Sequence, residues 1–543
     1  MNTTDIKRLF ILFLTVFLIT LTNISAQVVY VNINDPVYSF LDRLNVKGFI
    51  SLDSEVKPFT RAYIGSKLLE LKEKSYQLGK IENEELIWHL REYREELSLD
   101  DVGKRIVLYR YSDKKFNLSL SPIAGYGLTN FAGKSGHTRT IGLKTSISYS
   151  DWFGGQLNMS DNGQFGDNVD RIKLLTQERG REPISVSNGI EFSDVRTQIN
   201  FSADWASLSF NKDYQEWGNA YFGNLILSDK APSYPNFRIE LKPVKWLRFY
   251  YTFGWIHSGI IDSSSIINFS NSAGENGTFE QFINKYHVAN MLTVSPWDFV
   301  DFSFGNSIIF AGNFRPEMML PFNFFKYMDR DVGKKSQQDG NGQLFFEAVV
   351  RYPQKFKFYS TFFLDVTEIR NILDGDFWNT WFGFTVGGKH TGFILDDLDI
   401  TLEYTRVNPW VYEHKLDLTN YKHLNYSLGH WIGQNADQLR IQFNYQLLRG
   451  LKSELYVESF RKGKLGDVLS EAYQDKEVEP FLYGERRTET KIGFNAVYEP
   501  IHELFIRLNY KYSDINDELI SRTPDFMLGS NHSFGVSVVY GIP

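Results

Sequence analysis

Between about residues 116 and 540, the sequence repeats short runs in which every second residue is apolar or aromatic and the residues between are polar. A clear example is the run in which Leu504, Ile506, Leu508, Tyr510 and Tyr512 alternate with Phe505, Arg507, Asn509 and Lys511. Alternation with a period of two places one residue set on each face of a β-sheet. Two folds fit this pattern: a soluble β-sandwich with an apolar core, or a membrane barrel whose apolar face meets lipid.

Composition and length favour the barrel. Phe, Tyr and Trp make up 16% of the 543 residues, and membrane barrels need aromatic girdles at both lipid interfaces. No Pro/Gly/Ser linker divides residues 105–543, whereas a soluble chain of this length is expected to divide into several domains. We therefore predict an all-β transmembrane barrel of about eighteen antiparallel strands. Long polar loops are expected at residues 161–188, 262–278, 329–342 and 462–487.

The N-terminus resembles a secretory signal. Lys7 and Arg8 precede the apolar run 9–21, and the small residue Ala26 marks the expected cleavage site. An uncleaved anchor is the alternative, although the run is short for a spanning helix. The predicted organisation is a signal peptide (1–26), a periplasmic helical bundle (27–104) and an outer-membrane barrel (105–543).

The region before the barrel has helical rather than strand periodicity. Val37, Phe40, Leu41 and Leu44 fall on one helical face, and Gly48 is placed to end that helix. Thr60 is placed to cap a second helix, and a third, highly charged helix follows near residue 86. Three short helices bury little surface alone, so we expect them to pack against the barrel.

Several function classes lose support from composition and motifs. The net charge of −7 and the lack of a basic tract argue against nucleic acid as a partner. The chain has no cysteine, which removes disulfides and thiolate chemistry. Nucleotide-binding and hydrolase motifs are missing, so no cofactor is expected. His414, His423 and His430 match no known metal-ligand spacing, and we predict no metal site and no catalysis.

Binding of a sugar polymer is better supported. Glu403, Arg406 and Asn444 lie among the polar residues of the alternation and are expected to line the lumen. Aromatic residues near loops offer flat faces on which sugars stack, while sugar hydroxyls pair with polar side chains. The alternative for each ring is a place in the interface girdle.

Ordered motifs extend this interpretation. The most specific is the run Glu403-Tyr404-Thr405-Arg406-Val407-Asn408-Pro409-Trp410-Val411-Tyr412-Glu413-His414, followed by segments 428–430 and 433–437. Further motifs are residues 37–44, 57–61, 211–213, 217–218, 223–228, 231–235, 286–307, 320–321 and 363–365. Together they resemble the capsule-assembly Wzi family of outer-membrane proteins, in the form common in the Bacteroidetes.

The resemblance implies an eighteen-stranded barrel with a periplasmic helical bundle, acting as a non-enzymatic lectin that holds capsular or exopolysaccharide on the cell. The expected partners are surface polysaccharide and outer-membrane lipid, and the barrel is expected to be a monomer. The family usually has a glutamate at the position of Asn306, so a carboxylate-dependent role is not expected there. The residues expected to bind polysaccharide are Asp213, Trp217, Asp365, Glu403, Arg406, Trp410, Tyr412, His414, His430, Asn435 and Asp437.

Three alternatives stay open from the sequence. A charged lumen also suits a channel or porin. Related Bacteroidetes proteins are linked to gliding-motility adhesion, so the same fold can carry a surface adhesin. A barrel enzyme acting on lipid or glycan would use residues such as His414, His430 or Asp437.

Overall fold

The fold was analysed in a computed structural model of the chain. It describes residues 28–93, 106–113, 115–270, 276–325, 327–328, 340–366, 380–464 and 479–542. The predicted signal peptide (1–26) therefore lies outside the described residues. Among the described helices, none has the length and apolar character needed to cross a bilayer.

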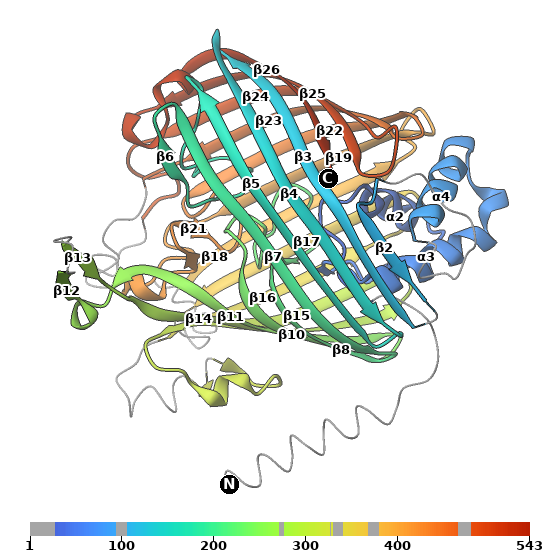
Figure 1. The fold of residues 1–543 in the computed structure, drawn as a ribbon, viewed down its shortest axis with the longest axis horizontal. Helices are drawn as coiled ribbons and strands as arrows, with labels where there is room; N and C mark the ends of the chain where they lie inside the picture. The colour runs from blue at the N-terminus through green and yellow to red at the C-terminus, as the bar shows by residue number, and fades with distance from the viewer. Residues whose placement is uncertain are drawn as a thin grey trace, which may run out of the picture.

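Eighteen strands form one closed antiparallel barrel. They are β3 (Phe116–Phe131), β4 (Lys134–Tyr149), β5 (Phe153–Gly166), β7 (Gly189–Ala203), β8 (Ala206–Asp213), β10 (Tyr234–Val244), β11 (Leu247–Ile261), β14 (Phe282–Trp297), β15 (Val300–Ala311), β16 (Asn341–Val350), β17 (Phe356–Val366), β18 (Thr380–Thr391), β19 (Leu398–Val407), β22 (Ala436–Leu448), β23 (Leu451–Lys462), β24 (Arg487–Tyr498), β25 (Leu504–Asp517) and β26 (Gly529–Tyr540). Each pairs with its neighbours in sequence, and β26 closes on β3 through pairs such as Val536 with Leu128. The predicted fold class is confirmed (Figure 1).

Short accessory strands complete the sheet system. β2 (Tyr109–Ser112) pairs with β3, and β6 (Ile184–Val186) pairs with β7. The remaining strands form three small pairs: β1 (Val56–Lys57) with β9 (Glu216–Trp217), β12 (Ile267–Ser270) with β13 (Asn276–Phe279), and β20 (Lys422–His423) with β21 (Tyr426–Ser427). Because β1 and β9 come from segments far apart in sequence, their pairing ties the N-terminal segment to a loop of the barrel.

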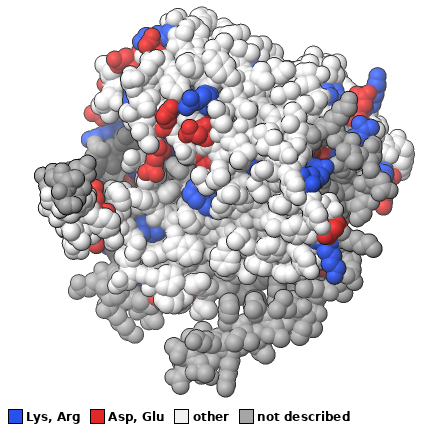
Figure 2. Space-filling view, viewed as in Figure 1, with Lys and Arg blue, Asp and Glu red and all other residues white. Residues whose placement is uncertain are grey.

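The alternation resolves into an apolar outer face and a polar inner face. On β25, the outward Ile506, Leu508 and Tyr510 are 37 to 40% exposed, as lipid-facing residues are in the absence of lipid. The wall seen in Figure 2 is largely free of charged side chains, which gather towards its two ends. Because a charge facing hydrocarbon is costly, this distribution fits a lipid-facing wall.

The two ends of the barrel differ. At the turn end, consecutive strands are joined by short turns, such as residues 204–205 between β7 and β8 and 245–246 between β10 and β11. Trp205, Trp246 and Trp297 lie at these turns and are exposed, as expected for an interfacial aromatic girdle. At the loop end, most connections are long, including residues 167–183, 214–233 and 408–435.

Three helices lie beside the turn end, where Figure 1 shows them in blue: α2 (Pro36–Val46), α3 (Arg61–Glu73) and α4 (Lys80–Glu92). Thr60 caps α3 by accepting a hydrogen bond from Tyr63 N, as predicted. Gly48 follows the end of α2 and has a φ of +82°. Glycine suits this position because a left-handed conformation strains any residue with a Cβ.

The helices bind the barrel through buried ion pairs. Arg43 on α2 bonds Glu82 at 3.2 Å and also pairs with Asp399 at the start of β19. On the segment after α2, Glu55 and Asp53 pair with Arg248 of β11, whose guanidinium also bonds Asp301 at 3.1 Å. Burying these charges together makes the docking geometry specific, because removing one partner leaves a charge uncompensated.

One segment after β15 lies against the outside of the barrel. This outer segment (residues 312–325) covers Tyr251 and Phe253, which point outward from β11 and are fully buried. Asn306 of β15 also faces outward: its side chain donates to Asn290 Oδ1 at 2.6 Å and accepts from Phe325 N at 2.9 Å. Asn290 in turn donates to the carbonyls of Pro321 and Asn323, both at 2.8 Å. Asn306 therefore anchors the outer segment rather than lining the lumen.

Replacing Asn306 with Leu is expected to lower barrel stability by about 2 kcal/mol, because Phe325 N–H and Asn290 Oδ1 would be buried without partners. The measurement is the temperature at which the folded band converts to the unfolded band on semi-native gels. Phe302→Leu is the control, since Phe302 points outward from the same strand and is half exposed. Equal conversion temperatures for Asn306→Leu and wild type would contradict the anchoring role.

Candidate functional site in the barrel lumen

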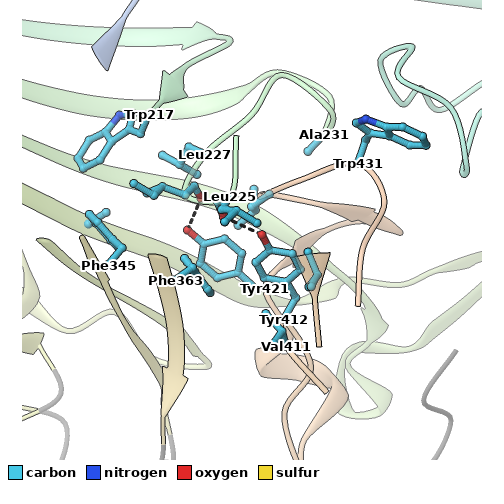
Figure 3. Packing of buried hydrophobic residues seen from close by; sticks show 14 of the residues in the cluster. Trp217, Leu225, Leu227, Ala231, Phe345, Phe363, Val411, Tyr412, Tyr421 and Trp431 are labelled. Atoms are coloured by element: carbon cyan, nitrogen blue, oxygen red, sulfur yellow. Dashed lines mark hydrogen bonds between the residues drawn. The ribbon is translucent and has the colours of Figure 1, made fainter. Parts of the chain in front are cut away.

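Two loops from the loop end fold into the lumen. We call residues 214–233, between β8 and β10, the first plug loop and residues 408–435, between β19 and β22, the second plug loop. Their side chains pack with inward wall residues in one buried cluster, shown in part in Figure 3. The cluster includes Trp217, Leu225 and Leu227 from the first plug loop, Tyr412, Tyr421 and Trp431 from the second, and Phe345 and Phe363 from the wall. The lumen therefore contains a hydrophobic core.

Two tyrosines join the plug loops. Tyr412 donates its hydroxyl proton to Leu225 O, and Tyr421 donates to Ile226 O, both at 2.8 Å (Figure 3). Their rings stack at 5.5 Å between centroids. Both side chains are almost fully buried, so these bonds are shielded from water and tie the two loops to each other.

Three carboxylates on the wall fix the backbone of the plug loops. Glu403 accepts from Tyr221 N at 2.7 Å and Phe222 N at 3.2 Å. Glu347 accepts from Asn219 N at 2.7 Å, and Asp365 accepts from Tyr412 N at 2.7 Å. Charge-assisted bonds of this kind are stronger than neutral ones, so the wall dictates where the loops turn.

Most of the predicted site residues belong to this plug and its supports. Trp217, Asp365, Glu403, Trp410, Tyr412, His430 and Asn435 are all less than 10% exposed. Asn435 bonds the next loop, accepting from Leu482 N at 2.8 Å and donating to Tyr483 O at 3.2 Å. The structure thus brings these residues together, but as a packed scaffold whose aromatic faces are covered.

The histidines of the second plug loop bond separate partners, and the buried His430 Nε2 has no hydrogen-bond partner among the described residues. His414 Nδ1 lies 2.6 Å from Thr419 Oγ1, and His423 Nδ1 accepts from His257 N at 2.8 Å. Burial lowers the pKa of His430 to about 3, so its imidazole is neutral at physiological pH. Within the described residues, no group of three or more potential metal ligands lies together.

Two of the predicted site residues, Arg406 and Asp437, face away from the lumen. Arg406 lies in register with Asp437, three residues beyond the inward Glu403, and so points outward. Its Nε bonds Asn408 at 2.9 Å, and Asp437 accepts from Tyr404 and Arg461 on the same outer face. The expectation that Arg406 lines the lumen is therefore wrong, because the alternation places it on the opposite face. Asp213, the last residue of β8, is half-buried at the loop end.

The barrel wall has a notch at the loop end. β8 pairs with β7 only along Thr197 to Ala203, so residues 189–196 of β7 have no β8 partner. β10 pairs with β11 only up to Gly254, so residues 255–261 of β11 extend beyond β10. On the same edge of β7, β6 pairs with residues 189–191, so residues 192–196 are the part that lacks a strand partner. The wall is therefore low where β8 meets β10, between two taller strands.

A cavity of about 910 Å³ opens at this notch, and we call it the notch cavity. Its lining includes Arg196 and Asp194 of β7, Lys212 of β8, and Trp255 of β11. Six basic side chains line it, namely Arg179, Arg181, Arg196, Lys212, Lys285 and Arg507, against four acidic ones, Glu178, Glu182, Asp194 and Asp229. The cavity thus carries an excess of positive charge.

The guanidinium groups of two arginines in the notch cavity lie against aromatic rings. The Arg179 guanidinium lies 3.9 Å from the centroid of the Tyr214 ring and bonds Asp229 at 2.8 Å. Arg181 lies 4.7 Å from the centroid of Phe192. Stacking and ion pairing fix these donors in place, so they need little reorganisation to bind a ligand.

Lys230 fastens the segment that carries these arginines. Its ammonium donates to the carbonyls of Thr176 and Glu178, both at 2.8 Å, and to that of Lys173. Burial lowers the pKa of Lys230 to about 7. Sequence reasoning identified residues 161–188 only as a loop, because a segment held by such non-local contacts has no periodicity.

Comparison with known proteins gives a consistent result. The family model described as capsule assembly protein Wzi matches residues 194–526. A solved structure described as Wzi, an outer-membrane protein involved in group 1 capsule assembly in Escherichia coli and a carbohydrate-binding β-barrel, aligns with a TM-score of 0.57 and 13% identity. That alignment covers 94% of this chain and 99% of the other.

Other barrels align less closely. OprD from Pseudomonas aeruginosa has a TM-score of 0.41 and 12% identity over 80% of this chain and 97% of its own. OpdK of the same species, solved with vanillate, has a TM-score of 0.42 and 9% identity. That alignment covers 78% of this chain and 98% of the other. No curated protein matches the sequence.

Replacing Glu403 with Ala is expected to loosen the first plug loop, because two buried backbone N–H groups would lose their acceptor at about 1–3 kcal/mol each. Limited trypsin digestion measures this as new cleavage after Lys230, which is buried in the wild type. Glu454→Ala is the control, since Glu454 bonds Arg440 and Asn495 on the wall and holds no plug-loop backbone. Protection at Lys230 equal to wild type would contradict the role of Glu403.

Proposed function

The chain belongs to the capsule assembly protein Wzi family, and we propose that it binds polysaccharide at the bacterial surface without catalysing a reaction. The observation that carries the proposal is a lumen filled on one side by two tightly anchored plug loops, with a charged and aromatic cavity beside them that opens at the loop end. The related Escherichia coli protein is described as a carbohydrate-binding barrel, and we extend that property to this chain.

The plug argues against the channel alternative. A porin needs a wide water-filled lumen, whereas here Trp217, Tyr412 and Phe345 pack in one buried cluster that fills the side of the lumen bounded by β10 to β23. The plug loops are also pinned by carboxylates on several strands, so opening a pore would break several buried charge-assisted bonds. A binding protein benefits from that rigidity, because a preorganised site loses less entropy when a ligand binds.

The chemistry of the notch cavity suits a sugar polymer. Sugar hydroxyls and carboxylates accept hydrogen bonds from guanidinium and ammonium groups, which Arg179, Arg181 and Lys212 supply. Trp255 is 39% exposed beside them and offers a ring face for stacking. We propose that the predicted residues Trp217, Glu403 and Tyr412 act indirectly, by holding the plug loops that shape this cavity.

We also propose an orientation and a non-catalytic role. Long loops of outer-membrane barrels face outward and short turns face the periplasm, which would place the notch cavity outside and helices α2 to α4 in the periplasm. Against catalysis stand the neutral, buried His430 and the bonding of His414 to Thr419. A general acid or base needs an accessible group that titrates near neutral pH.

The first test measures binding directly. Trp255→Ala is expected to weaken binding of surface polysaccharide purified from the source bacterium about three- to tenfold, the value of one aromatic contact. The measurement is titration calorimetry with the full chain in detergent. Trp297→Ala is the matched control, because Trp297 is also exposed but lies at the turn end. Equal losses for both variants would contradict a site at the loop end.

The second test measures retention on cells. Deleting the gene is expected to release surface polysaccharide into the medium, and the wild-type gene should restore retention. Complementation with Arg179→Ala should restore it only partly, because the ring-stacked donor is missing. Wild-type retention in the deletion strain would overturn the proposed function.

A further inference from the structure

The notch cavity also opens towards the lipid-facing side of the barrel wall. We infer that it is a lateral entrance through which the notch cavity takes the anionic head group of a glycolipid anchored in the outer leaflet. This inference rests on the proposed function, because it names the form in which the glycan reaches the site. It has three structural supports: the height of the wall, the residues on both faces of the lip, and the charge of the cavity.

The wall at the notch is shorter than the hydrocarbon layer. The eight residues of β8, tilted as barrel strands usually are, span roughly 20 Å along the barrel axis, against about 25 Å for the apolar band of such barrels. The fifteen residues of neighbouring β7 span roughly 38 Å on the same basis. Trp205 and Trp246 fix the lower edge of this wall section at the turn-end interface. On the same basis the eleven residues of β10 span roughly 28 Å, so the wall is lowest at β8, and there its upper edge lies within the outer leaflet.

The cavity lining crosses the wall. Asp194 and Arg196 belong to the inward face of β7, while Lys212, Trp255 and Tyr286 stand on the outward faces of β8, β11 and β14. A cavity that ended inside the lumen would be lined by inward residues alone. The notch cavity therefore continues from the lumen, over the low edge of β8 and β10, to the lipid-facing side.

The outer segment gives the notch an apolar border. Phe314 contacts Phe253 and Tyr286, with ring centroids 5.8 and 6.1 Å apart, and Tyr286 itself lines the cavity. Leu320 and Phe322 of the same segment are 57% and 72% exposed on the outside of the barrel. This border continues the lipid-facing wall, so acyl chains can lie against it while a polar head group enters the notch.

The charge of the cavity selects an anionic head group. Its basic side chains outnumber its acidic ones by two, six against four. Among the described residues, Lys212 and Lys285 have no ion-pair partner within 4 Å: their ammonium groups bond only Val195 O, Ser233 Oγ and Lys422 O. A phosphate or sugar carboxylate would supply the missing countercharge in a partly desolvated place, where such pairs are strongest. A neutral lipid would leave those ammonium groups unpaired.

Native mass spectrometry of the full chain, released from detergent micelles, tests the ligand class. The probe is Kdo2-lipid A, an anionic glycolipid, with dioleoylphosphatidylglycerol as an anionic lipid that lacks sugar. Wild type should retain Kdo2-lipid A at roughly tenfold lower concentration than the phospholipid, a difference of about 1.4 kcal/mol. Lys212→Glu should remove most of this preference, and Lys212→Gln part of it. Lys72→Glu makes the same charge change on the exposed face of α3 and should leave the preference unchanged.

Site-directed spin labelling tests the geometry without a ligand. The chain has no cysteine, so Ser193→Cys, at an exposed position on the notch lip, can carry a single nitroxide label. In liposomes, that label should collide more often with oxygen, which partitions into lipid, than with a water-soluble nickel chelate. The same label at Tyr76→Cys, on the 82% exposed Tyr76 position beside the helices, should show the reverse. Heat-modifiable gel migration confirms that each variant is folded.

The outcomes separate this inference from the proposed function. Equal retention of the two lipids, an unchanged preference in folded Lys212→Glu, or a water-exposed label at position 193 overturns the lateral entrance. If soluble polysaccharide still binds in such a case, the proposed function stands. Preference for Kdo2-lipid A without polysaccharide binding would support the lateral entrance and contradict the proposed function. Binding of neither overturns both.

Discussion

A barrel of eighteen strands encloses a lumen that its own wall side chains cannot fill, and the rest of this structure follows from that constraint. The chain fills the side of this space next to β10 to β23 with two long loops and leaves a cavity beside β4, β5 and β7. Buried backbone N–H groups need acceptors, and the wall supplies them through Glu347, Asp365 and Glu403. Between these anchors the loops close on an aromatic core, so the molecule has a hydrophobic interior although it faces lipid outside.

Because the plug loops need acceptors, the inward polar residues of the alternation are not all free to bind a ligand. A carboxylate on an inward strand position can bind a ligand or can bind the protein's own loop. Glu403 does the second, since its two oxygens are occupied by Tyr221, Phe222 and Tyr359. The residues that remain open to a ligand lie beside the plug, where Arg179 and Trp255 border the notch. Rigid support and ligand contact are thus separated in space, which lets the support be buried completely.

The short strand β8 connects the plug to the membrane side. Ending β8 at Asp213 frees the following twenty residues to turn inward as the first plug loop, and the same early end lowers the wall. The first plug loop and the notch therefore both result from the short length of β8. The outer segment adds an apolar border next to the low wall, and its anchor through Asn306 and Asn290 is the reason that two amides are tolerated on a lipid-facing surface.

The sequence alone determined the barrel, because period-two alternation, turn spacing and the cap at Thr60 are local properties. The strand alternation fixed which residues face lipid, and ordered motifs such as 403–414 indicated the family. The site could be predicted only in part. Trp217, Glu403 and Tyr412 were identified as important, but whether their surfaces are open or covered depends on loops distant in sequence. Arg179, Lys212 and Trp255 come together only because the barrel closes and β8 ends early. Contacts of that kind leave no local pattern, so only the tertiary structure decided them.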